Sequence, residues 1–322
     1  MTFSEREVTC GRLAADRLSL GLSLAEVQQI DTMLADRWGI TMPMPPEQWE
    51  ERLATLAGHD LAAEYWRLNN KIAWRDAMRL PVPAKLETAF YNVLADERIS
   101  GHVHSRKRTE ILDAACLLIH LVRELGIAGP VLDIGCHIGY HAQLLAQRAH
   151  ATVHGIDRCS KAIEAARAKT VGASAMTFGV GSLAEQGYNR SFEFIYAVRS
   201  IRLDKTSARQ IAAALMPGGV AVILPRGIPA AARRHRQAIL DAGLGWGLSD
   251  VVGGFVGEGR GYQAGLVIVL IKHGRRSMPA DFVQQAHSIW EQHFTGYANA
   301  PDTPPAEKNQ AYFRGKWRQA RG

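Results

Sequence analysis

The chain has 322 residues and carries 38 Lys and Arg against 31 Asp and Glu, so its formal net charge is +7. Hydrophobic residues make up 47% of it and charged residues 21%, which is typical of a soluble globular protein and excludes a mainly disordered chain. No apolar run reaches the ~18 residues of a membrane-spanning helix, and the start MTFSEREVTC lacks the apolar stretch of a secretory signal. We therefore expect a cytoplasmic protein with no membrane partner.

Neither metal binding nor nucleic-acid binding is indicated by the composition. The four cysteines lie far apart, without a CxxC pair: Cys10, Cys116, Cys136 and Cys159. The basic clusters are short and dispersed: 106–108, 233–236 and 275–276. A dedicated nucleic-acid binder usually concentrates its basic residues in one stripe or patch. We expect no metal and do not expect a nucleic-acid partner.

The first hundred residues have the pattern of helices only. Ser23 and Glu26 form a capping-box pair ahead of an apolar periodic run to residue 38. Three further helices are predicted between proline and glycine breaks: 46–58, 61–78 and 84–100. The charged segment 102–108 is predicted to link them to another helix over 109–126.

After Pro130, short β-branched runs alternate with helical patterns. The predicted strands are 131–134, 152–157, 175–180, 192–198 and 220–224, and the predicted helices are 139–149, 160–169, 204–215 and 229–243. Two later strands, near 249–256 and 262–271, lack a helix-length spacer and should pair antiparallel. This order predicts an α/β fold with a mostly parallel sheet, whose ligands bind beyond the carboxyl ends of the strands near the first one.

The segment Val131–Tyr140, VLDIGCHIGY, is the most informative part of the chain. An apolar strand ends near an acid, and a glycine-containing turn leads into a helix. A dinucleotide fingerprint, G-x-G-x-x-G, does not fit, because His137 stands between Gly135 and Gly139. The segment instead resembles the first motif of class I S-adenosylmethionine-dependent methyltransferases, roughly (D/E)-x-G-x-G-x-G.

Further motifs agree with this resemblance in order and spacing, over about residues 110–273. Asp157 ends the second strand, 24 residues after Asp133, where the family has an acid that binds both ribose hydroxyls. Ser182 follows the third strand, where the family usually has an acid near the adenine. The run LMPGGVAVIL at 215–224 is similar to the family's entry to its fifth strand.

The resemblance implies a Rossmann-like, mostly parallel seven-stranded sheet with an antiparallel last strand, preceded by an all-helical cap. The domains expected are a cap or substrate lid at 1–105, a cofactor-binding domain at 106–275, and a C-terminal helix and basic tail at 276–322. The implied cofactor is S-adenosylmethionine. The residues expected to bind it are Asp133, Gly135, His137, Gly139, Asp157, Arg158, Gly181, Ser182 and Val198.

Two departures from the family pattern bear on the chemistry. His137 replaces the middle glycine, so its side chain either contacts the methionine portion of the cofactor or only points into the turn. After the fourth strand, Ala197-Val198-Arg199-Ser200 stands in place of the Asp/Asn-Pro-Pro-Tyr/Phe of enzymes that methylate DNA adenine or protein glutamine. This difference favours a small-molecule substrate.

The catalytic candidates are Tyr140, His141 and Arg199. His141 could instead face the core, and Arg199 could be a solvated surface residue. In the cap, six residues are candidates for lining the substrate pocket or for filling the cap core: Tyr65, Trp66, Asn69, Trp74, Tyr91 and Asn92.

We expect an enzyme that methylates a small-molecule metabolite. One alternative uses the same cofactor for aminocarboxypropyl transfer or for cyclisation to azetidine-2-carboxylate, both of which release methylthioadenosine. A less favoured alternative is nucleic-acid methylation. The acceptor and the oligomeric state stay open.

Overall fold

The computed structural model describes residues 22–41, 46–78, 80–170, 172, 174–201, 204–224, 245–255 and 263–272. The expected helix at 229–243, the basic clusters at 233–236 and 275–276, and the tail at 276–322 lie outside these residues. Within the described ranges, no helix combines the length and apolarity needed to cross a bilayer.

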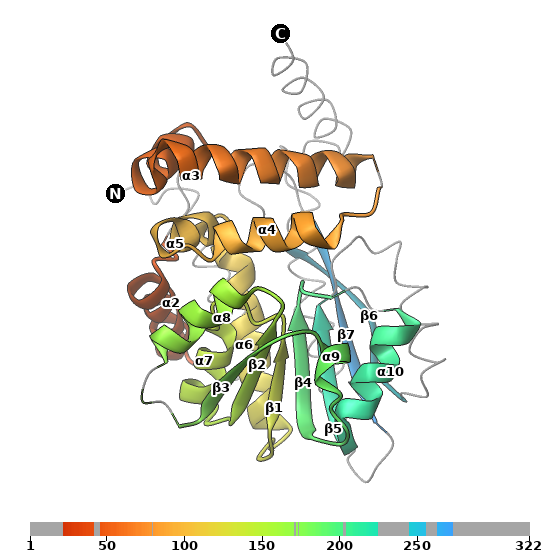
Figure 1. The fold of residues 1–322 in the computed structure, drawn as a ribbon. Coiled ribbons are helices and arrows are strands. Elements are labelled where there is room, and N and C mark those ends of the chain that lie inside the picture. The colour runs from red at the N-terminus through yellow and green to blue at the C-terminus, as the bar shows by residue number, and fades with distance from the viewer. Residues whose placement is uncertain are drawn as a thin grey trace.

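The described chain begins with helices and continues as alternating strands and helices (Figure 1). The helices are α2 (Leu24–Trp38), α3 (Pro46–Ala77), α4 (Ala84–Leu94), α5 (Glu97–Ser105), α6 (Arg108–Glu124), α7 (Tyr140–Arg148), α8 (Ser160–Lys169), α9 (Leu183–Gln186) and α10 (Lys205–Ala214). The strands are β1 (Val131–Ile134), β2 (Val153–Asp157), β3 (Met176–Val180), β4 (Phe192–Val198), β5 (Leu215–Leu224), β6 (Gly245–Phe255) and β7 (Gln263–Ile271).

The strands form one sheet in the order β3-β2-β1-β4-β5-β7-β6. Strands β1 to β5 run parallel to one another, which confirms the expected α/β fold. Strand β7 runs antiparallel to both β5 and β6. The strand order reverses at β1, with β2 on one side and β4 on the other, so the β1–α7 turn lies at the point where such sheets bind ligands.

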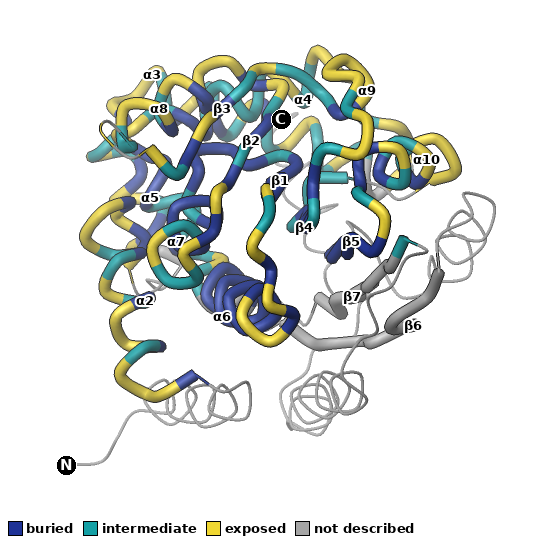
Figure 2. Tube along the Cα trace, turned by 90° about the horizontal axis from the view of Figure 1, so that it is seen from below, coloured by how far each residue is buried: buried dark blue, intermediate teal, exposed yellow. Residues whose placement is uncertain are grey.

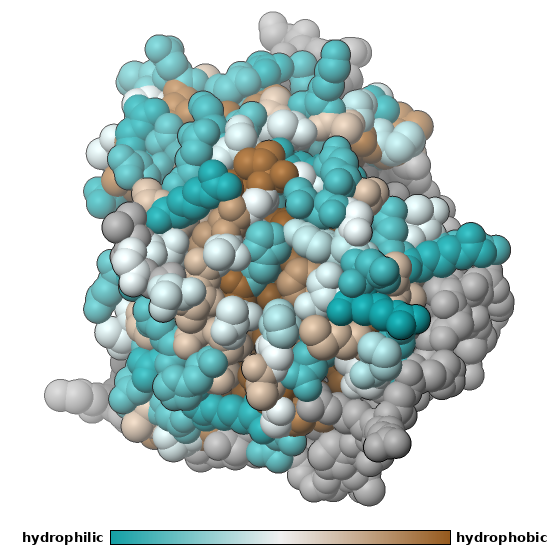
Figure 3. Space-filling model, turned by 60° about the horizontal axis from the view of Figure 1, so that its bottom comes forward, coloured by the Kyte–Doolittle hydropathy of each residue, from teal (hydrophilic) through white to brown (hydrophobic). Residues whose placement is uncertain are grey.

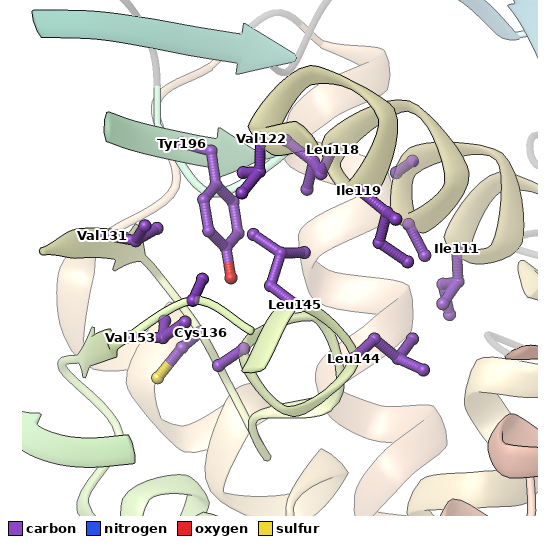
Figure 4. Close-up of a cluster of buried hydrophobic side chains, with 14 of the residues drawn as sticks. Ile111, Leu118, Ile119, Val122, Val131, Cys136, Leu144, Leu145, Val153 and Tyr196 are labelled. Carbon is purple, nitrogen blue, oxygen red and sulfur yellow. The ribbon is translucent and has the colours of Figure 1, made fainter. Parts of the chain in front are cut away.

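Alternate residues of the central strands point into two separate apolar cores, one on each face of the sheet. Val131 of β1 and Phe194 of β4 join the core under α6, α7 and α8, whereas Leu132 and Ile195 join the core under α9 and α10. This is the period of two expected for a sheet covered on both faces. The first core is shown in Figure 4, where the buried Tyr196 ring lies among side chains of α6 and α7.

Helix α2 belongs to the same core as the sheet. Its buried residues Val27, Ile30 and Leu34 are part of the larger apolar cluster, and it packs on α5, α6 and α7. Ser23 and Glu26 form the expected capping box, and Gly39 ends the helix in a left-handed conformation. Viewed from below, α2 lies outside the strongly buried α6 (Figure 2).

Helices α3, α4 and α5 lie across the edge of the sheet where β1 to β5 end (Figure 1). They have their own small core, built around Trp49, Leu53 and Tyr65. Helix α3 packs mainly on α4 and α5, while α4 contacts α8 and α5 contacts α2. These three helices, which we call the cap, therefore reach the rest of the protein mainly through α4 and α5.

Two element boundaries in the cap differ from expectation. The helix predicted over 84–100 ends at Leu94, and α5 extends to Ser105, so the predicted linker 102–108 is largely helical. Asp96 causes the break, because its side chain accepts a hydrogen bond from the backbone of Arg98 and starts a new helix. Gly58 (φ 72°, ψ 162°) separates the two predicted helices, which otherwise form the continuous α3.

The two ends of the cap segment meet on α2. The hydroxyl of Ser105 accepts a hydrogen bond from the backbone N–H of Thr41 at 2.9 Å. Near this point Gly101 packs so closely that a Cβ atom there would lie 2.1 Å from the carbonyl oxygen of Trp38. Glycine at position 101 is thus required by the approach of α5 to the end of α2.

We predict that Gly101→Ala lowers the free energy of unfolding by about 1–3 kcal/mol, the usual cost of overpacking a core. Urea denaturation followed by circular dichroism measures this change. Gly179→Ala is the matched control, since a Cβ there meets its nearest atom at an ordinary 3.5 Å. Equal stability of both variants would contradict the close approach.

Candidate functional site

The β1–α7 turn is held by glycine geometry and by packing. Gly135 (φ 73°) and Gly139 (φ 78°) both adopt left-handed conformations, which glycine alone adopts without strain. A Cβ on Gly135 would lie 2.2 Å from the Cβ of Ser200, and one on Gly139 would lie 2.9 Å from the ring of Phe178. The two motif glycines are therefore required by the fold itself, next to β4 and β3.

Asp157, at the carboxyl end of β2, stabilises this turn through hydrogen bonds to backbone N–H groups. One carboxylate oxygen accepts the backbone N–H of His137 at 2.9 Å, and the other accepts the N–H of Cys159 at 2.8 Å. Burial raises the pKa of Asp157, while these two hydrogen bonds lower it. Each carboxylate oxygen has about two acceptor positions, so one on each remains for a further donor.

His137 occupies the middle of the turn in an unusual state. Its backbone is left-handed (φ 49°), a conformation found in only a few per cent of residues other than glycine, with asparagine, aspartate and histidine enriched among them. The side chain is 7% exposed, and neither ring nitrogen has a hydrogen-bond partner within the described structure. Burial lowers the pKa of His137 to about 4, so its imidazole is neutral at pH 7.

The His137 ring faces the cap. Its centroid lies 5.0 Å from that of His104 on α5 and 6.0 Å from that of Tyr91 on α4. His104 is in turn 5.7 Å from the ring of Tyr140, the first residue of α7. The rings of His104 and Tyr91 in the cap therefore lie next to the β1–α7 turn, and Tyr140 lies beside His104.

The other two catalytic candidates have structural partners. His141 is buried, and its Nε2–H donates to the carbonyl of Ile111 at 3.2 Å, which links α7 to α6. Burial lowers the pKa of His141 to about 4. Arg199 follows β4 with φ 52°, and its backbone N–H donates to Leu224 at 2.6 Å. A catalytic role of either residue stays a prediction.

Asp133 is buried on the α6 side of β1, beside Tyr196 of β4. Asp133 Oδ2 and the Tyr196 hydroxyl have no hydrogen-bond partner among the described residues. Burial raises the pKa of Asp133 to about 8, and the neighbouring Tyr196 hydroxyl opposes this effect. Figure 4 shows the apolar side chains around Tyr196.

The other residues expected to bind the cofactor follow or end strands β2, β3 and β4. Val180 ends β3 with 46% of its surface exposed, and Gly181 follows with φ 142°. Ser182 caps the short α9 through reciprocal hydrogen bonds with Glu185. Arg158 is exposed after Asp157, and Val198 ends β4 half-buried. An exposed apolar side chain thus stands where a flat base is expected to pack.

The six cap candidates divide into two groups. Tyr65 is buried in the cap core against Trp49, and Trp66 packs on both. Tyr91 and Asn92 instead face the sheet domain: Tyr91 approaches His137, and Asn92 Oδ1 accepts a hydrogen bond from the Cys159 thiol at 3.0 Å. Asn69 is half-buried and Trp74 is 38% exposed, both on α3.

Two residues of this arrangement were missed by the sequence analysis, His104 and Cys159, together with the contact between the Cys159 thiol and Asn92. His104 fell in a charged run interpreted as a linker. The signal for a helix there was Asp96, a typical N-cap residue. No sequence signal pairs Asn92 with Cys159, because their contact depends on how α4 lies against α8.

The basic cluster at 106–108 is engaged within the protein. The Arg106 guanidinium lies over the Trp49 ring, 4.6 Å from its centroid, and Arg108 forms an ion pair with Asp31 of α2.

Within the described ranges, no three His, Cys, Asp or Glu side chains are grouped so that they could hold a metal ion. The face drawn in Figure 3 mixes hydrophilic and apolar residues, with the most apolar surface near its middle.

We predict that Asp133 makes stability fall as pH rises. Its folded pKa lies above its unfolded value, so the unfolded state releases the proton first and stability is lost between about pH 4 and pH 8. Asp133→Asn should match the wild type near pH 4 and exceed it increasingly up to pH 8, at about 1.4 kcal/mol per pH unit at most. Urea midpoints measured from pH 4 to pH 9 test this, and a pH-independent difference would contradict it.

Comparison with known proteins supports the resemblance seen in the sequence. Residues 131–219 match a family model described as a methyltransferase domain. No curated protein matches the chain.

The chain is also similar to solved structures. One is a putative methyltransferase in complex with the *Haloferax volcanii* Trm112 activator, with 16% identity over 57% of this chain and 97% of that one, and a TM-score of 0.44. Another is geranyl diphosphate C-methyltransferase from *Streptomyces coelicolor* A3(2), with 13% identity over 52% and 84% and a TM-score of 0.41. A third is the [4+2]-cyclase SpnF, with 13% identity over 52% and 83% and a TM-score of 0.43.

These structural likenesses are too distant to carry an argument about activity. The family match begins at β1 and includes the whole β1–α7 turn. The strand order is observed in the structure of this chain itself and does not depend on these comparisons. Residues 131–219 are therefore similar to a methyltransferase domain, in agreement with the resemblance noted in the sequence.

Proposed function

We propose that this protein transfers the methyl group of S-adenosylmethionine to a small molecule bound between the turn and the cap. The observation that carries the proposal is the position of Asp157. It ends β2 beside the motif turn, and each of its oxygens keeps an acceptor position after binding one backbone N–H. A carboxylate in this state can accept both hydroxyls of a ribose.

The neighbouring residues fit the other parts of the cofactor. The exposed Val180 offers apolar surface to the adenine, and Gly181 beside it adds no side chain. Asp133, Gly135 and Gly139 build the turn toward the methionine portion, together with His137. Ser182, Arg158 and Val198 complete the expected set around these groups, with Ser182 acting first as the cap of α9.

The cap supports a small acceptor rather than a polymer. Helices α4 and α5 lie over the turn, and their His104 and Tyr91 approach His137. The basic residues Arg106 and Arg108 are engaged by Trp49 and Asp31 instead of lining a track for phosphates. We therefore assign residues 1–105 a lid role, with 106–275 binding the cofactor, and note that α2 also belongs to the core of the latter.

Mass spectrometry of the purified protein with S-adenosylmethionine, with and without cell extract, tests the function. S-adenosylhomocysteine that forms only with extract supports methyl transfer. Methylthioadenosine that forms without extract, above the buffer control, would show attack on the methionine chain and replace this proposal with aminocarboxypropyl transfer or azetidine formation.

We predict that Asp157→Ala weakens S-adenosylhomocysteine binding about tenfold to a hundredfold, because a hydrogen bond to a charged group contributes about 1.5–3 kcal/mol. Calorimetry measures the affinity. Because Asp157 also holds the turn, the 2′-deoxy analogue of S-adenosylhomocysteine is the control ligand. Loss of the 2′-hydroxyl should weaken binding to the wild type but not to the variant. An equal loss in both proteins would contradict the ribose contact.

We predict that Tyr91→Ala lowers turnover at least tenfold while S-adenosylhomocysteine affinity stays within about threefold, because Tyr91 faces the turn from the cap. Point variants are preferable to removing residues 1–100, since that deletion also removes α2 from the main core. Phe90→Ala, in the same helix and packed on both Tyr65 and Tyr91, is the control for cap stability. Unchanged turnover in Tyr91→Ala would contradict the lid role.

A further inference from the structure

His137 has features that a purely structural residue would not keep. Its left-handed backbone would suit the glycine that the family has at this position. Its ring is almost fully buried with both nitrogens unpaired, and leaving a buried polar atom without a partner costs about 1–3 kcal/mol. A neutral imidazole has one donor and one acceptor nitrogen, so a bound group that both donates and accepts would satisfy it.

The ring faces the acceptor side of the site. The backbone N–H of His137 points to Asp157, the expected ribose-binding carboxylate. The imidazole instead lies near His104 and Tyr91, which belong to the cap helices α5 and α4. The same residue thus has its backbone directed at the cofactor side and its side chain directed at the cap.

The hydrogen bonding of His104 determines what this neighbour can do. His104 Nδ1 lies 2.6 Å from the carbonyl of Ser100, and a carbonyl only accepts, so Nδ1 carries the proton. The other nitrogen, Nε2, is then an acceptor. Burial lowers the pKa of His104 to about 3, so its ring is neutral at pH 7 and offers no positive charge to an acidic substrate. Its Nε2 can accept a hydrogen bond from a neighbouring ring N–H.

We propose, building on the methyl transfer proposed above, that the acceptor is a neutral molecule bearing a hydroxyl group, bound between the cap and the β1–α7 turn, and that His137 removes the hydroxyl proton. His104 is the positioning residue: its Nε2 accepts the N–H on the His137 ring nitrogen that does not face the hydroxyl. Tyr91 forms part of the wall of this acceptor site.

The reaction balances with these groups alone. The hydroxyl O–H bond breaks and its proton passes to the free nitrogen of His137. An oxygen electron pair forms the bond to the methyl carbon, and the electrons of the broken carbon–sulfur bond stay on sulfur. The products are a methyl ether, a neutral thioether and a protonated imidazole. No oxidant, metal or further reactant is needed.

The electrostatics favour proton transfer during the methyl transfer rather than before it. Burial holds the pKa of the unloaded His137 near 4, and a sulfonium cation beside it lowers that pKa further. As the carbon–sulfur bond breaks, the sulfonium charge disappears and the imidazolium charge replaces it. The buried site carries one positive charge before and after the step, so no additional charge is desolvated.

His137→Gly tests the proposal, since glycine suits φ 49° and matches the family pattern. His150→Gly is the matched control: it makes the same substitution at a left-handed position (φ 54°) on an exposed residue after α7. Urea denaturation of both variants checks that they fold. We expect both to bind S-adenosylhomocysteine within about threefold of the wild type by calorimetry. A loss of tenfold or more in His137→Gly alone would place this side chain on the cofactor and overturn the proposal.

The second measurement uses S-adenosylmethionine with a carbon-13 methyl label and the small-molecule fraction of an extract from the source cells. Carbon-13 NMR then identifies the atom that receives the methyl group. We expect an O-methyl product, about a hundredfold slower formation with His137→Gly, as for loss of a general base, and partial recovery when imidazole is added. His150→Gly should form it at the wild-type rate.

Each other outcome has a distinct meaning. A methyl group on nitrogen, sulfur or carbon, or an unchanged rate in His137→Gly, would overturn this inference and leave the proposed methyl transfer intact. A wild-type protein that does not bind S-adenosylhomocysteine, or that labels no small molecule, would overturn the proposed function and this inference together.

Discussion

The site depends on one carboxylate that ties three segments together. Asp157 belongs to β2, accepts the N–H of His137 in the β1–α7 turn, and accepts the N–H of Cys159 at the start of α8. Removing these hydrogen bonds would free the turn on which the glycines and His137 are arranged. The same carboxylate is also the group proposed to bind the ribose, so folding of the turn and recognition of the cofactor share one residue.

Much of the fold could be predicted because its signals are local. The β-branched runs predicted strands β1 to β5, and the glycines of the motif predicted the turn, which is now seen to need positive φ at Gly135 and Gly139. The break at Asp96 was missed because a good helix former, Ala95, precedes it, and capping outweighed propensity there. The short α9 was also missed, since four residues carry no periodicity.

The candidate site was less predictable, because its contacts join segments distant in the chain. Asp157, Gly135 and Gly139 were predicted from the resemblance of their motifs to those of the methyltransferase family. The approach of His104 to His137, and of Asn92 to Cys159, depends on how the cap lies across the sheet edge. A pattern of residue types does not encode such an angle between helices. His141 shows the converse, as a plausible base by position whose ring binds a carbonyl of α6.

The hydrogen bond between Thr41 and Ser105 has a consequence for how such a protein can diversify. The cap leaves the body after α2 and returns beside it, so its two ends are neighbours in space. The cap is thus an insertion between helices α2 and α6 of the sheet domain, not an extension of one terminus. Segments whose ends meet can be lengthened, shortened or exchanged at little cost in loop-closure entropy. The surface that faces the β1–α7 turn can therefore change by replacement of the cap while the sheet and its turn stay the same.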